Sequence, residues 1–358
     1  MSKEDKDLKT RVVKAYGDEE KDRALMKEAG DIIRNGGLVA MPTETVYGLA
    51  GDALNKDSSR KIYAAKGRPS DNPLIVHIAD MDALDKIVTE IPDSARRLAD
   101  RYWPGPLTMV FNKSAIVPLE TTGGLETVAV RMPVNEIARE FIRASGGYIA
   151  APSANKSGRP SCTTAAHVLE DLKGEIELII DGGAVGIGLE STIVDMTSAV
   201  PCLLRPGYIN LQMLEELLGK IDVDPSIGGV MDASAHPKAP GMKYKHYAPK
   251  GELFIVEGES GAVIEKINSL IKEREAVGEK VAVIASDETK GLYKCDIIKD
   301  VGSRRDEESI AHNLFAVLRE MDELEVTTIY SESFDTPRMG MAIMNRLIRA
   351  AGHKVIRV

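Results

Sequence analysis

Two cations flank a glycine in the stretch AAKGRPSDNPLIVHI, which covers residues 64–78. Lys66 and Arg68 end a predicted helix, a proline turn follows, and His77 lies in the apolar run after the turn. Lysine and arginine both bind phosphates, and arginine also binds carboxylates through two parallel hydrogen bonds. The stretch therefore contains the groups that a site for anionic ligands needs.

Further polar side chains lie at the ends of other predicted strands. Thr127 and Arg131 share one face of TVAVRM, and His77 shares a face with Ile75 in LIVHI, because strand side chains alternate. Strand ends in α/β domains are where ligand-binding groups gather, so we expect one site for phosphate and carboxylate groups. The other polar residues of this kind are Thr43, Glu44, Thr45 and Tyr47 in PTETVYG; Ser153, Asn155, Lys156, Ser157, Arg159 and Ser161 after YIAA; Ser191 and Thr192 in STIVD; and Arg205 in LLRPG.

Each of these features also has an ordinary structural interpretation. Arg131 could protect a strand edge, and His77 could be a satisfied core histidine. Lys66 and Arg68 could simply suit a helix C-terminus, where cations are favoured. The Ser- and Asn-rich loop after YIAA is typical of a turn. Their joint occurrence at strand ends favours a binding site.

The elements that must position these residues alternate between strands and helices. Apolar runs predict strands at LVAM, LIVHI, LTMVF, TVAVRM, YIAA, ELIID and STIVDM, which indicates a mixed α/β domain of roughly two hundred residues. After residue 250, LFIVEG, VAVIAS, CDIIKDVG, TTIYSES and VIRV alternate with helical stretches, which predicts a small parallel-sheet domain. The predicted helices are 18–35, a helix capped by Asp57 or Ser58 that runs to Ala65, 81–101, Asn135 to Ala144, 163–173, Asn210 to Leu218, 260–277, 306–322 and 338–350.

The segment between the two predicted domains is rich in proline and glycine. Its part ASAHPKAPGMKYKHYAPKG, from Ala233 to Gly251, has four lysines, two histidines, two tyrosines and no acidic residue. Prolines limit the conformations that a segment loses when it orders over a ligand, so this segment could be a lid, and a passive, protease-sensitive tether is the alternative.

Composition limits the class of protein. The 358 residues carry a formal net charge of −9, with 43% hydrophobic and 28% charged residues, which indicates a soluble globular chain without a broad basic surface for DNA. The three cysteines form no CxxC pair, and no apolar run is long enough for a membrane span. The charged start MSKEDKDLKTR predicts no signal peptide, so we expect a cytoplasmic protein. The P-loop, HExxH and GxSxG motifs are absent.

A known family carries the same motifs. PTETVYGL, KGRP with NPL, WPGPLT, VAVRMP, APSAN with SG, LESTIVD and PGMKYKHYAP closely resemble the threonylcarbamoyl-AMP synthases of the longer, two-domain type. The resemblance implies a YrdC-like catalytic domain with a twisted mixed sheet over residues 12–221. It also implies a linker or lid over 222–250 and a smaller Rossmann-like C-terminal domain with a parallel sheet over 251–358.

The resemblance implies a nucleotidyltransferase, L-threonylcarbamoyladenylate synthase. Such an enzyme converts L-threonine, bicarbonate or CO2, and ATP into threonylcarbamoyl-AMP and pyrophosphate, and Mg²⁺ arrives with the ATP. A separate transfer machinery then modifies the adenosine next to the anticodon of certain tRNAs. This chemistry needs positioning and charge neutralisation rather than a protein nucleophile.

The same resemblance assigns roles to single residues. The catalytic group that faces the phosphates would be Lys66, Arg68, Ser153 and Asn155. Threonine would be held by Thr45, His77, Arg131, Ala151 and Ser191, with Arg131 on the carboxylate. ATP would be held by Arg68, Asn72, Thr127, Ser153, Ser161, Arg205 and the linker residue Tyr247. No residue is assigned as a metal ligand.

Two other functions stay open. An RNA-binding module without ATP turnover would place several exposed aromatic residues among its basic ones, and 4% of this chain is aromatic. The carbamoyl-adenylate-forming transferases of hydrogenase maturation resemble the first domain, but those chains also carry zinc-finger cysteine pairs, which this sequence lacks.

Overall fold

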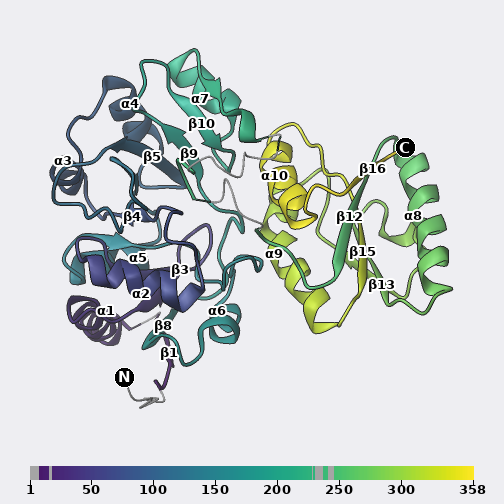
Figure 1. Cartoon of the computed structure of the whole chain (residues 1–358), viewed down its shortest axis with the longest axis horizontal. Coiled ribbons are helices and arrows are strands. Elements are labelled where there is room, and N and C mark those ends of the chain that lie inside the picture. The colour runs from purple at the N-terminus through teal and green to yellow at the C-terminus, as the bar shows by residue number, and fades with distance from the viewer. Residues whose placement is uncertain (1–7, 16–17, 228, 230–236, 241–245) are drawn as a thin grey trace.

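The protein is described here by a computed structural model, which covers residues 8–15, 18–227, 229, 237–240 and 246–358. Within these residues the chain forms an eleven-stranded mixed sheet and a five-stranded sheet whose strands all run parallel. The two sheets belong to two lobes that lie side by side (Figure 1). The α/β class, with a mixed sheet followed by a smaller parallel one, is therefore confirmed.

The larger lobe is built around the mixed sheet, whose strands are, in chain order, β1 (Arg11–Lys14), β2 (Val39–Met41), β3 (Gly48–Asp52), β4 (Ile75–His77), β5 (Leu107–Asn112), β6 (Thr127–Arg131), β7 (Ile149–Ala150), β8 (Leu178–Asp181), β9 (Thr192–Asp195), β10 (Cys202–Arg205) and β11 (Asp222–Val223). Their order across the sheet is β1-β8-β2-β3-β7-β4-β6-β5-β9-β10-β11. The central strands are short apolar runs buried on both faces, because helices and loops cover the sheet on both sides.

The helices of the larger lobe are α1 (Glu19–Arg34), α2 (Lys56–Lys66), α3 (Leu84–Ile87), α4 (Asp93–Tyr102), α5 (Glu136–Ala144), α6 (Ala165–Leu172) and α7 (Leu211–Leu218), with the 3-10 turns η1 (Met81–Ala83) and η2 (Pro225–Ile227). Asn135 and Asn210 cap α5 and α7, as predicted. Their side-chain oxygens accept hydrogen bonds from the N–H groups of Ala138 and Met213. Such caps satisfy backbone donors that a helix leaves unpaired at its start.

Two predicted helices differ from the structure. The cap of α2 is Asn55, not Asp57 or Ser58, because the Asn55 side chain accepts the Asp57 N–H at 2.9 Å. The stretch 81–101 is not one helix. Val88 adopts an extended conformation after α3, and a proline precedes the new start at α4.

The smaller lobe contains β12 (Glu252–Glu257), β13 (Val281–Ala285), β14 (Ile297–Asp300), β15 (Thr328–Glu332) and β16 (Val355–Arg357), with α8 (Ser260–Glu275), α9 (Glu307–Glu323), α10 (Gly340–Ala350) and the 3-10 turn η3 (Lys290–Leu292). Its strand order is β14-β13-β15-β12-β16. Helix α8 covers one face of this sheet, whereas α9 and α10 cover the face toward the larger lobe (Figure 1).

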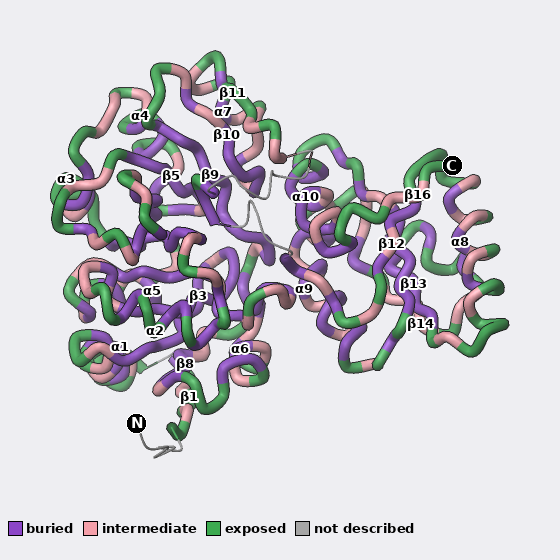
Figure 2. The backbone as a smooth tube through the Cα atoms, viewed as in Figure 1, coloured by how far each residue is buried: buried purple, intermediate pink, exposed green. Residues whose placement is uncertain are grey.

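One apolar cluster crosses from lobe to lobe. Val46, Leu189 and Tyr247 belong to the same buried cluster as Leu314 and Phe315 of α9. Figure 2 shows buried stretches along the strands of both sheets and along α9 and α10. The contact between the lobes is therefore a part of the hydrophobic core.

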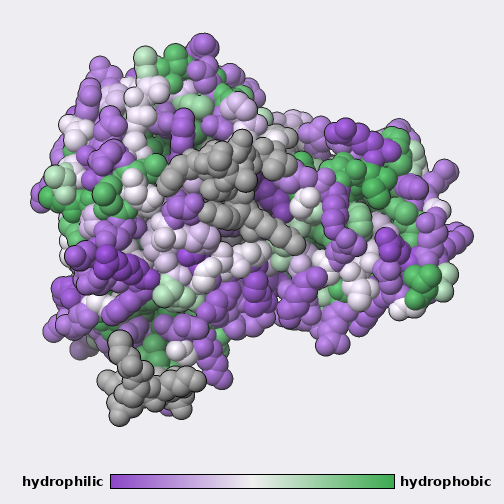
Figure 3. All heavy atoms as spheres, in the orientation of Figure 1, coloured by the Kyte–Doolittle hydropathy of each residue, from purple (hydrophilic) through white to green (hydrophobic). Residues whose placement is uncertain are grey.

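The face of the molecule drawn in Figure 3 is mostly hydrophilic. On the face drawn in Figure 3, apolar residues gather in separate patches among hydrophilic ones. Across the described residues, no helix has the length and hydropathy needed to span a membrane.

Candidate active site

One cavity opens where several strands of the larger sheet end. It contains about 530 Å³ of free space, its open mouth included. The wall combines the loop after β2, the ends of β4, β6 and β10, the loop after β7 and the residues before β9. The lining residues are Thr43, Val46, Tyr47, Gly48, Arg68, Ile75, His77, Arg131, Ala151, Pro152, Ser153, Glu190, Ser191, Arg205, Pro240, His246 and Tyr247.

Strand register brings the polar residues of this wall together. β6 lies between β4 and β5. Its Arg131 is paired with His77 of β4 on one side and with Thr108 of β5 on the other. The Thr108 hydroxyl lies 2.7 Å from the Ser191 hydroxyl. His77 and Ile75 both line the cavity, which confirms the predicted shared face.

Arg131 is a buried cation of the wall that keeps a free donor among the described residues. Its side chain is 4% exposed, Nη1 donates to the Thr45 hydroxyl at 2.8 Å, and Nη2 lies 2.7 Å from Glu44 Oε1. Within the part of the chain that the structure describes, its Nε has no hydrogen-bond partner. A buried guanidinium with an unused donor is suited to a carboxylate ligand.

His77 is electrically neutral in this site. Burial, together with the positive charge of Arg131, lowers the pKa of His77 to about 3. Its Nδ1 lies 3.2 Å from the Ile75 carbonyl oxygen, so Nδ1 carries the proton and donates it there. The other ring nitrogen is left as an acceptor beside Arg131.

We expect acid to destabilise the wild-type protein more than His77→Gln. The pKa of His77 is about 3 in the folded protein and about 6.5 in the unfolded chain, so the unfolded chain binds more protons between these values. Stability is therefore lost as pH falls below 6.5, by about 2 kcal/mol at pH 5 from this residue. Urea unfolding of both proteins at pH 7 and pH 5 measures the difference. Equal losses would contradict the burial of a neutral imidazole.

The cation–glycine–cation joint turns the chain into the cavity wall. Helix α2 ends at Lys66, and Gly67 follows with a φ of 63°, a left-handed conformation that favours glycine. Arg68 then lines the cavity, where Nε donates to the Asn72 carbonyl at 3.2 Å and Nη2 to the Pro73 carbonyl at 3.0 Å. The joint thus presents one of its two cations to the cavity.

The other cation lies beneath the wall. From the sequence, Lys66 was predicted to face the phosphates, but its ammonium donates to the backbone carbonyls of Ser153 and Asn155. Burial, assisted by the charge of Arg68, lowers the pKa of Lys66 to about 7. A buried ammonium needs hydrogen-bond acceptors, and these two carbonyls supply them. Lys66 therefore supports the loop that carries Ser153, and its catalytic role stays a prediction.

Asn155 also supports this loop. Its Oδ1 accepts the Ser153 hydroxyl at 2.5 Å, and its Nδ2 donates to the carbonyls of Lys156 and Arg159 at 2.8 and 2.9 Å. These bonds close the turn that follows, so the small-residue loop has a defined shape and leaves Ser153 on the cavity wall.

Arg205 holds the opposite side of the wall. Its Nε donates to the Ser191 carbonyl at 3.0 Å, Nη2 to the Ser191 hydroxyl at 3.2 Å, and Nη1 to the Pro240 carbonyl at 3.3 Å. Burial lowers the pKa of Arg205 to about 10, so the side chain stays charged at neutral pH. Three arginines, on separate elements, therefore bring positive charge to one cavity.

The linker reaches the cavity at Pro240 and at the adjacent residues His246 and Tyr247. Tyr247 is buried, lies in the left-handed region with a φ of 64°, and packs its ring against Phe315 at 5.0 Å between centroids. His246 beside it also lines the cavity. The rest of the predicted lid includes residues 230–236 and 241–245, which lie outside the described residues. Closure of the linker over a ligand therefore stays a prediction.

Glu190 is a site residue that the sequence did not predict. Its Oε1 accepts the Ser161 hydroxyl at 2.5 Å, and its Oε2 accepts Arg346 Nε at 3.1 Å. Burial favours the neutral acid, but Arg346, Arg205 and the Ser161 hydroxyl together bring the pKa of Glu190 below its ordinary value. The motif LEST contains this glutamate, but the arginine that pairs with it is 156 residues away. His246 also lines the cavity and was not predicted.

The structure brings most of the predicted site residues together. The Asn72 carbonyl accepts a hydrogen bond from Arg68. Thr127, in contrast, is at the far end of β6, roughly 13 Å along the strand from Arg131. Thr45, Lys66, Asn155 and Ser161 each hydrogen-bond to a residue of the wall. The predicted residues on the wall itself are Arg68, His77, Arg131, Ala151, Ser153, Ser191, Arg205 and Tyr247.

Comparison with known proteins gives the family. A family model described as "Telomere recombination" matches residues 31–207, and one described as "Threonylcarbamoyl-AMP synthase, C-terminal domain" matches residues 209–352. The threonylcarbamoyl-AMP synthase of Pyrococcus abyssi is 50% identical over 330 residues, which cover 92% of this chain and 95% of that protein. The chain belongs to the threonylcarbamoyl-AMP synthase family.

Other members of the threonylcarbamoyl-AMP synthase family agree with this. The protein of that name from Bacillus subtilis is 48% identical over 332 residues, 92% of this chain and 94% of that protein. A solved structure of P. abyssi Sua5 complexed with L-threonine matches with a TM-score of 0.91 and 47% identity, over 98% of this chain and 99% of that one. The family and fold that the motifs predicted are confirmed.

Proposed function

We propose that the protein is an L-threonylcarbamoyladenylate synthase, which forms threonylcarbamoyl-AMP and pyrophosphate from L-threonine, bicarbonate or CO2, and ATP. The observation that carries the proposal is the convergence of Arg68, Arg131 and Arg205 on one small cavity in a chain of this family. Both ATP and threonine bring negative charge, and clustered guanidinium groups are suited to phosphate and carboxylate.

The threonine half of the reaction uses the side of the cavity near β4 and β6. Arg131 would hold the threonine carboxylate, with Thr45 fixing the guanidinium. Small Ala151 leaves room for the substrate. The amine, once it has lost a proton, attacks the carbon of CO2. A C–N bond forms, the electron pair of one C–O π bond goes to oxygen, and the nitrogen releases a second proton to water, which leaves a carbamate anion beside the threonine carboxylate. This carbamate is unstable in water, which favours its formation in a confined site.

The nucleotide half uses the residues around α2 and the loop after β7. A carbamate oxygen attacks the α-phosphorus of ATP, a new P–O bond forms, and the bond to the β-phosphate oxygen breaks to release pyrophosphate. Arg68 and Arg205 would neutralise the charge that develops on the phosphates, and Ser153 would donate a hydrogen bond. The protein supplies position and charge rather than a covalent intermediate.

We expect Mg²⁺ to enter with ATP. Among the described residues, no three His, Cys, Asp or Glu side chains are grouped to hold a metal ion, so phosphate oxygens and water would be its ligands. Chelation by EDTA should abolish turnover, and excess Mg²⁺ should restore it. Chromatographic detection of a threonine-dependent adenylate, together with pyrophosphate release, tests both the function and the metal requirement.

The same assay separates the alternatives. Adenylate formed from carbamoyl phosphate, without threonine and bicarbonate, would indicate the carbamoyl transferase instead. A salt-sensitive RNA shift without ATP turnover would indicate an RNA-binding module, but Tyr47 and Tyr247 in the cavity are 0% and 3% exposed and unsuited to stacking on RNA bases. For the synthase, a separate cytoplasmic machinery would move the product's threonylcarbamoyl group to tRNA.

A further inference from the structure

Two arginines of the smaller lobe are buried against the larger lobe. Arg319 of α9 is 1% exposed and Arg346 of α10 is 0% exposed. A buried guanidinium is costly unless it is paired and hydrogen-bonded, so the partners of these two residues indicate what they hold in place.

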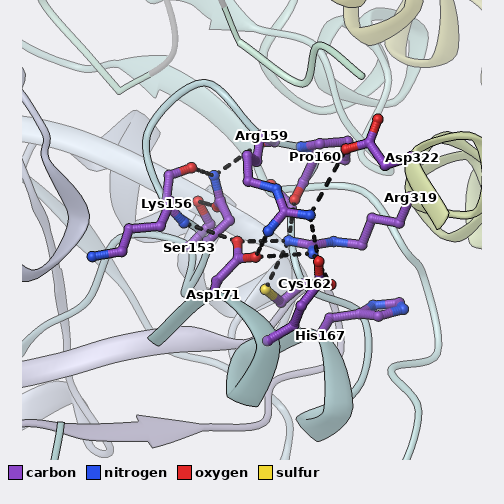
Figure 4. Close-up of polar contacts among 12 residues, drawn as sticks. Ser153, Lys156, Arg159, Pro160, Cys162, His167, Asp171, Arg319 and Asp322 are labelled. Carbon is purple, nitrogen blue, oxygen red and sulfur yellow. Dashed lines mark hydrogen bonds and ion pairs between the residues drawn. The ribbon is translucent and has the colours of Figure 1, made fainter. Parts of the chain in front are cut away.

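Arg319 holds the loop after β7. Its Nη1 and Nη2 donate to the two carboxylate oxygens of Asp171 at 3.2 and 2.9 Å, and Nη2 also donates to the Pro160 carbonyl at 2.7 Å (Figure 4). Asp171 in turn accepts the Lys156 N–H at 2.9 Å and pairs with Arg159. One side chain of the smaller lobe thus fixes both ends of the turn that Asn155 closes.

Arg346 holds the opposite side of the same cavity. Its Nε donates to Glu190 Oε2 and its Nη2 to the Glu190 carbonyl, both at 3.1 Å. Its Nη1 donates to the carbonyl of Pro206, the residue after Arg205. Glu190 also accepts the Ser161 hydroxyl, so Arg346 is connected through Glu190 to the C-terminal part of the loop after β7.

We propose that Arg319 and Arg346 are positioning residues through which the smaller lobe sets the ATP-binding half of the cavity. The segments that they hold carry Ser153, Ser161 and Arg205, the residues proposed for the nucleotide. Helix α9 adds a third contact, since Phe315 packs against Tyr247. This inference rests on the proposed function and assigns a task to the smaller lobe.

The carboxylate side of the threonine half is held by contacts within the larger lobe. Arg131 donates to the Thr45 hydroxyl and pairs with Glu44, and all three residues belong to the larger lobe. Ser191 lies at the boundary, because its hydroxyl contacts Thr108 of β5 and also accepts a hydrogen bond from Arg205. Substitution of Arg319 or Arg346 should therefore weaken ATP use and leave threonine binding largely intact.

The test compares Arg319→Lys, Arg319→Met and Arg346→Lys in the full chain. Lysine keeps the charge but not the fork that joins two acceptors. We expect kcat/KM for ATP to fall by about 10- to 100-fold, because small displacements of positioning groups have effects of this size. The threonine dissociation constant, measured by calorimetry, should change less than about twofold. The control Arg357→Met removes an exposed ion pair with Glu257 of the smaller lobe and should behave as wild type.

The result has two clear readings. ATP kinetics like wild type in folded Arg319→Lys and Arg346→Lys, or equal losses of ATP and threonine binding, would overturn the inference. Thermal unfolding shows which variants are folded. If Arg319→Met does not fold, the two lysine variants alone test the inference. If the wild type forms no adenylate, the proposed function fails, and calorimetric ATP affinities of wild type and variants still test the positioning role.

Discussion

Arg131→Ala raises the threonine concentration needed for adenylate formation by about 100-fold, with the ATP requirement little changed. A hydrogen bond to a charged group contributes roughly 1.5–3 kcal/mol, and about 3 kcal/mol corresponds to this factor. Arg131→Lys restores part of the affinity, because an ammonium is a point charge without the bidentate fork. Initial rates over a range of threonine concentrations measure the effect.

The variant also leaves the buried Glu44 carboxylate without its 2.7 Å partner, so stability has to be separated from binding. The double variant Glu44→Gln, Arg131→Ala removes that unpaired charge, and it should recover stability without recovering threonine affinity. Arg143→Ala, which breaks an exposed ion pair with Asp80, is a matched control. An unchanged KM for threonine in folded Arg131→Ala would exclude Arg131 from the carboxylate site.

Lys66→Met lowers adenylate formation by about 100-fold with a small effect on stability. The ammonium fastens the carbonyls of Ser153 and Asn155, so its loss displaces the loop that carries Ser153. Met fills a similar volume without the cost of a buried charge. Lys61→Met, on the same helix, removes a lysine that donates to the Gly36 carbonyl away from the cavity, and should keep full activity. Full activity of Lys66→Met would favour an ordinary helix-end cation.

The same variant changes the pH dependence of stability. The pKa of Lys66 is about 7 in the folded protein and 10.5 in its ordinary state, so the unfolded chain binds more protons between these values. Lys66 therefore makes the free energy of unfolding of the wild type increase as pH rises from 7 to 10.5. Lys66→Met lacks this increase. Urea unfolding at pH 7 and pH 9.5 provides the comparison.

Local rules were enough to predict much of the fold and one face of the site. Strand alternation placed His77 and Arg131 on the cavity side, because a period of two holds wherever a strand forms. Asn135 and Asn210 were recognisable as caps, since a cap depends on the next three residues alone. The motifs after β7 and before β9 also indicated residues that the structure brings to the cavity.

Contacts between distant segments could not be predicted in this way. Nothing near Glu190 in the chain indicates that Arg346 will neutralise it, and Arg319 is equally remote from Asp171. The direction of Lys66 depends on two carbonyls that only the folded loop brings within reach. The break at Val88 shows that tertiary pairing can interrupt a sequence with helical character, because Val88 bridges Lys113.

The apolar cluster shared by the two lobes also has a consequence for cooperativity. Val46 and Leu189 come from the larger lobe, yet they pack in the same core as Phe315 of α9. Removing the smaller lobe would expose these side chains to water and would remove the arginine partners that Asp171 and Glu190 have in that lobe. We therefore expect the two lobes to unfold together, in one melting transition rather than two.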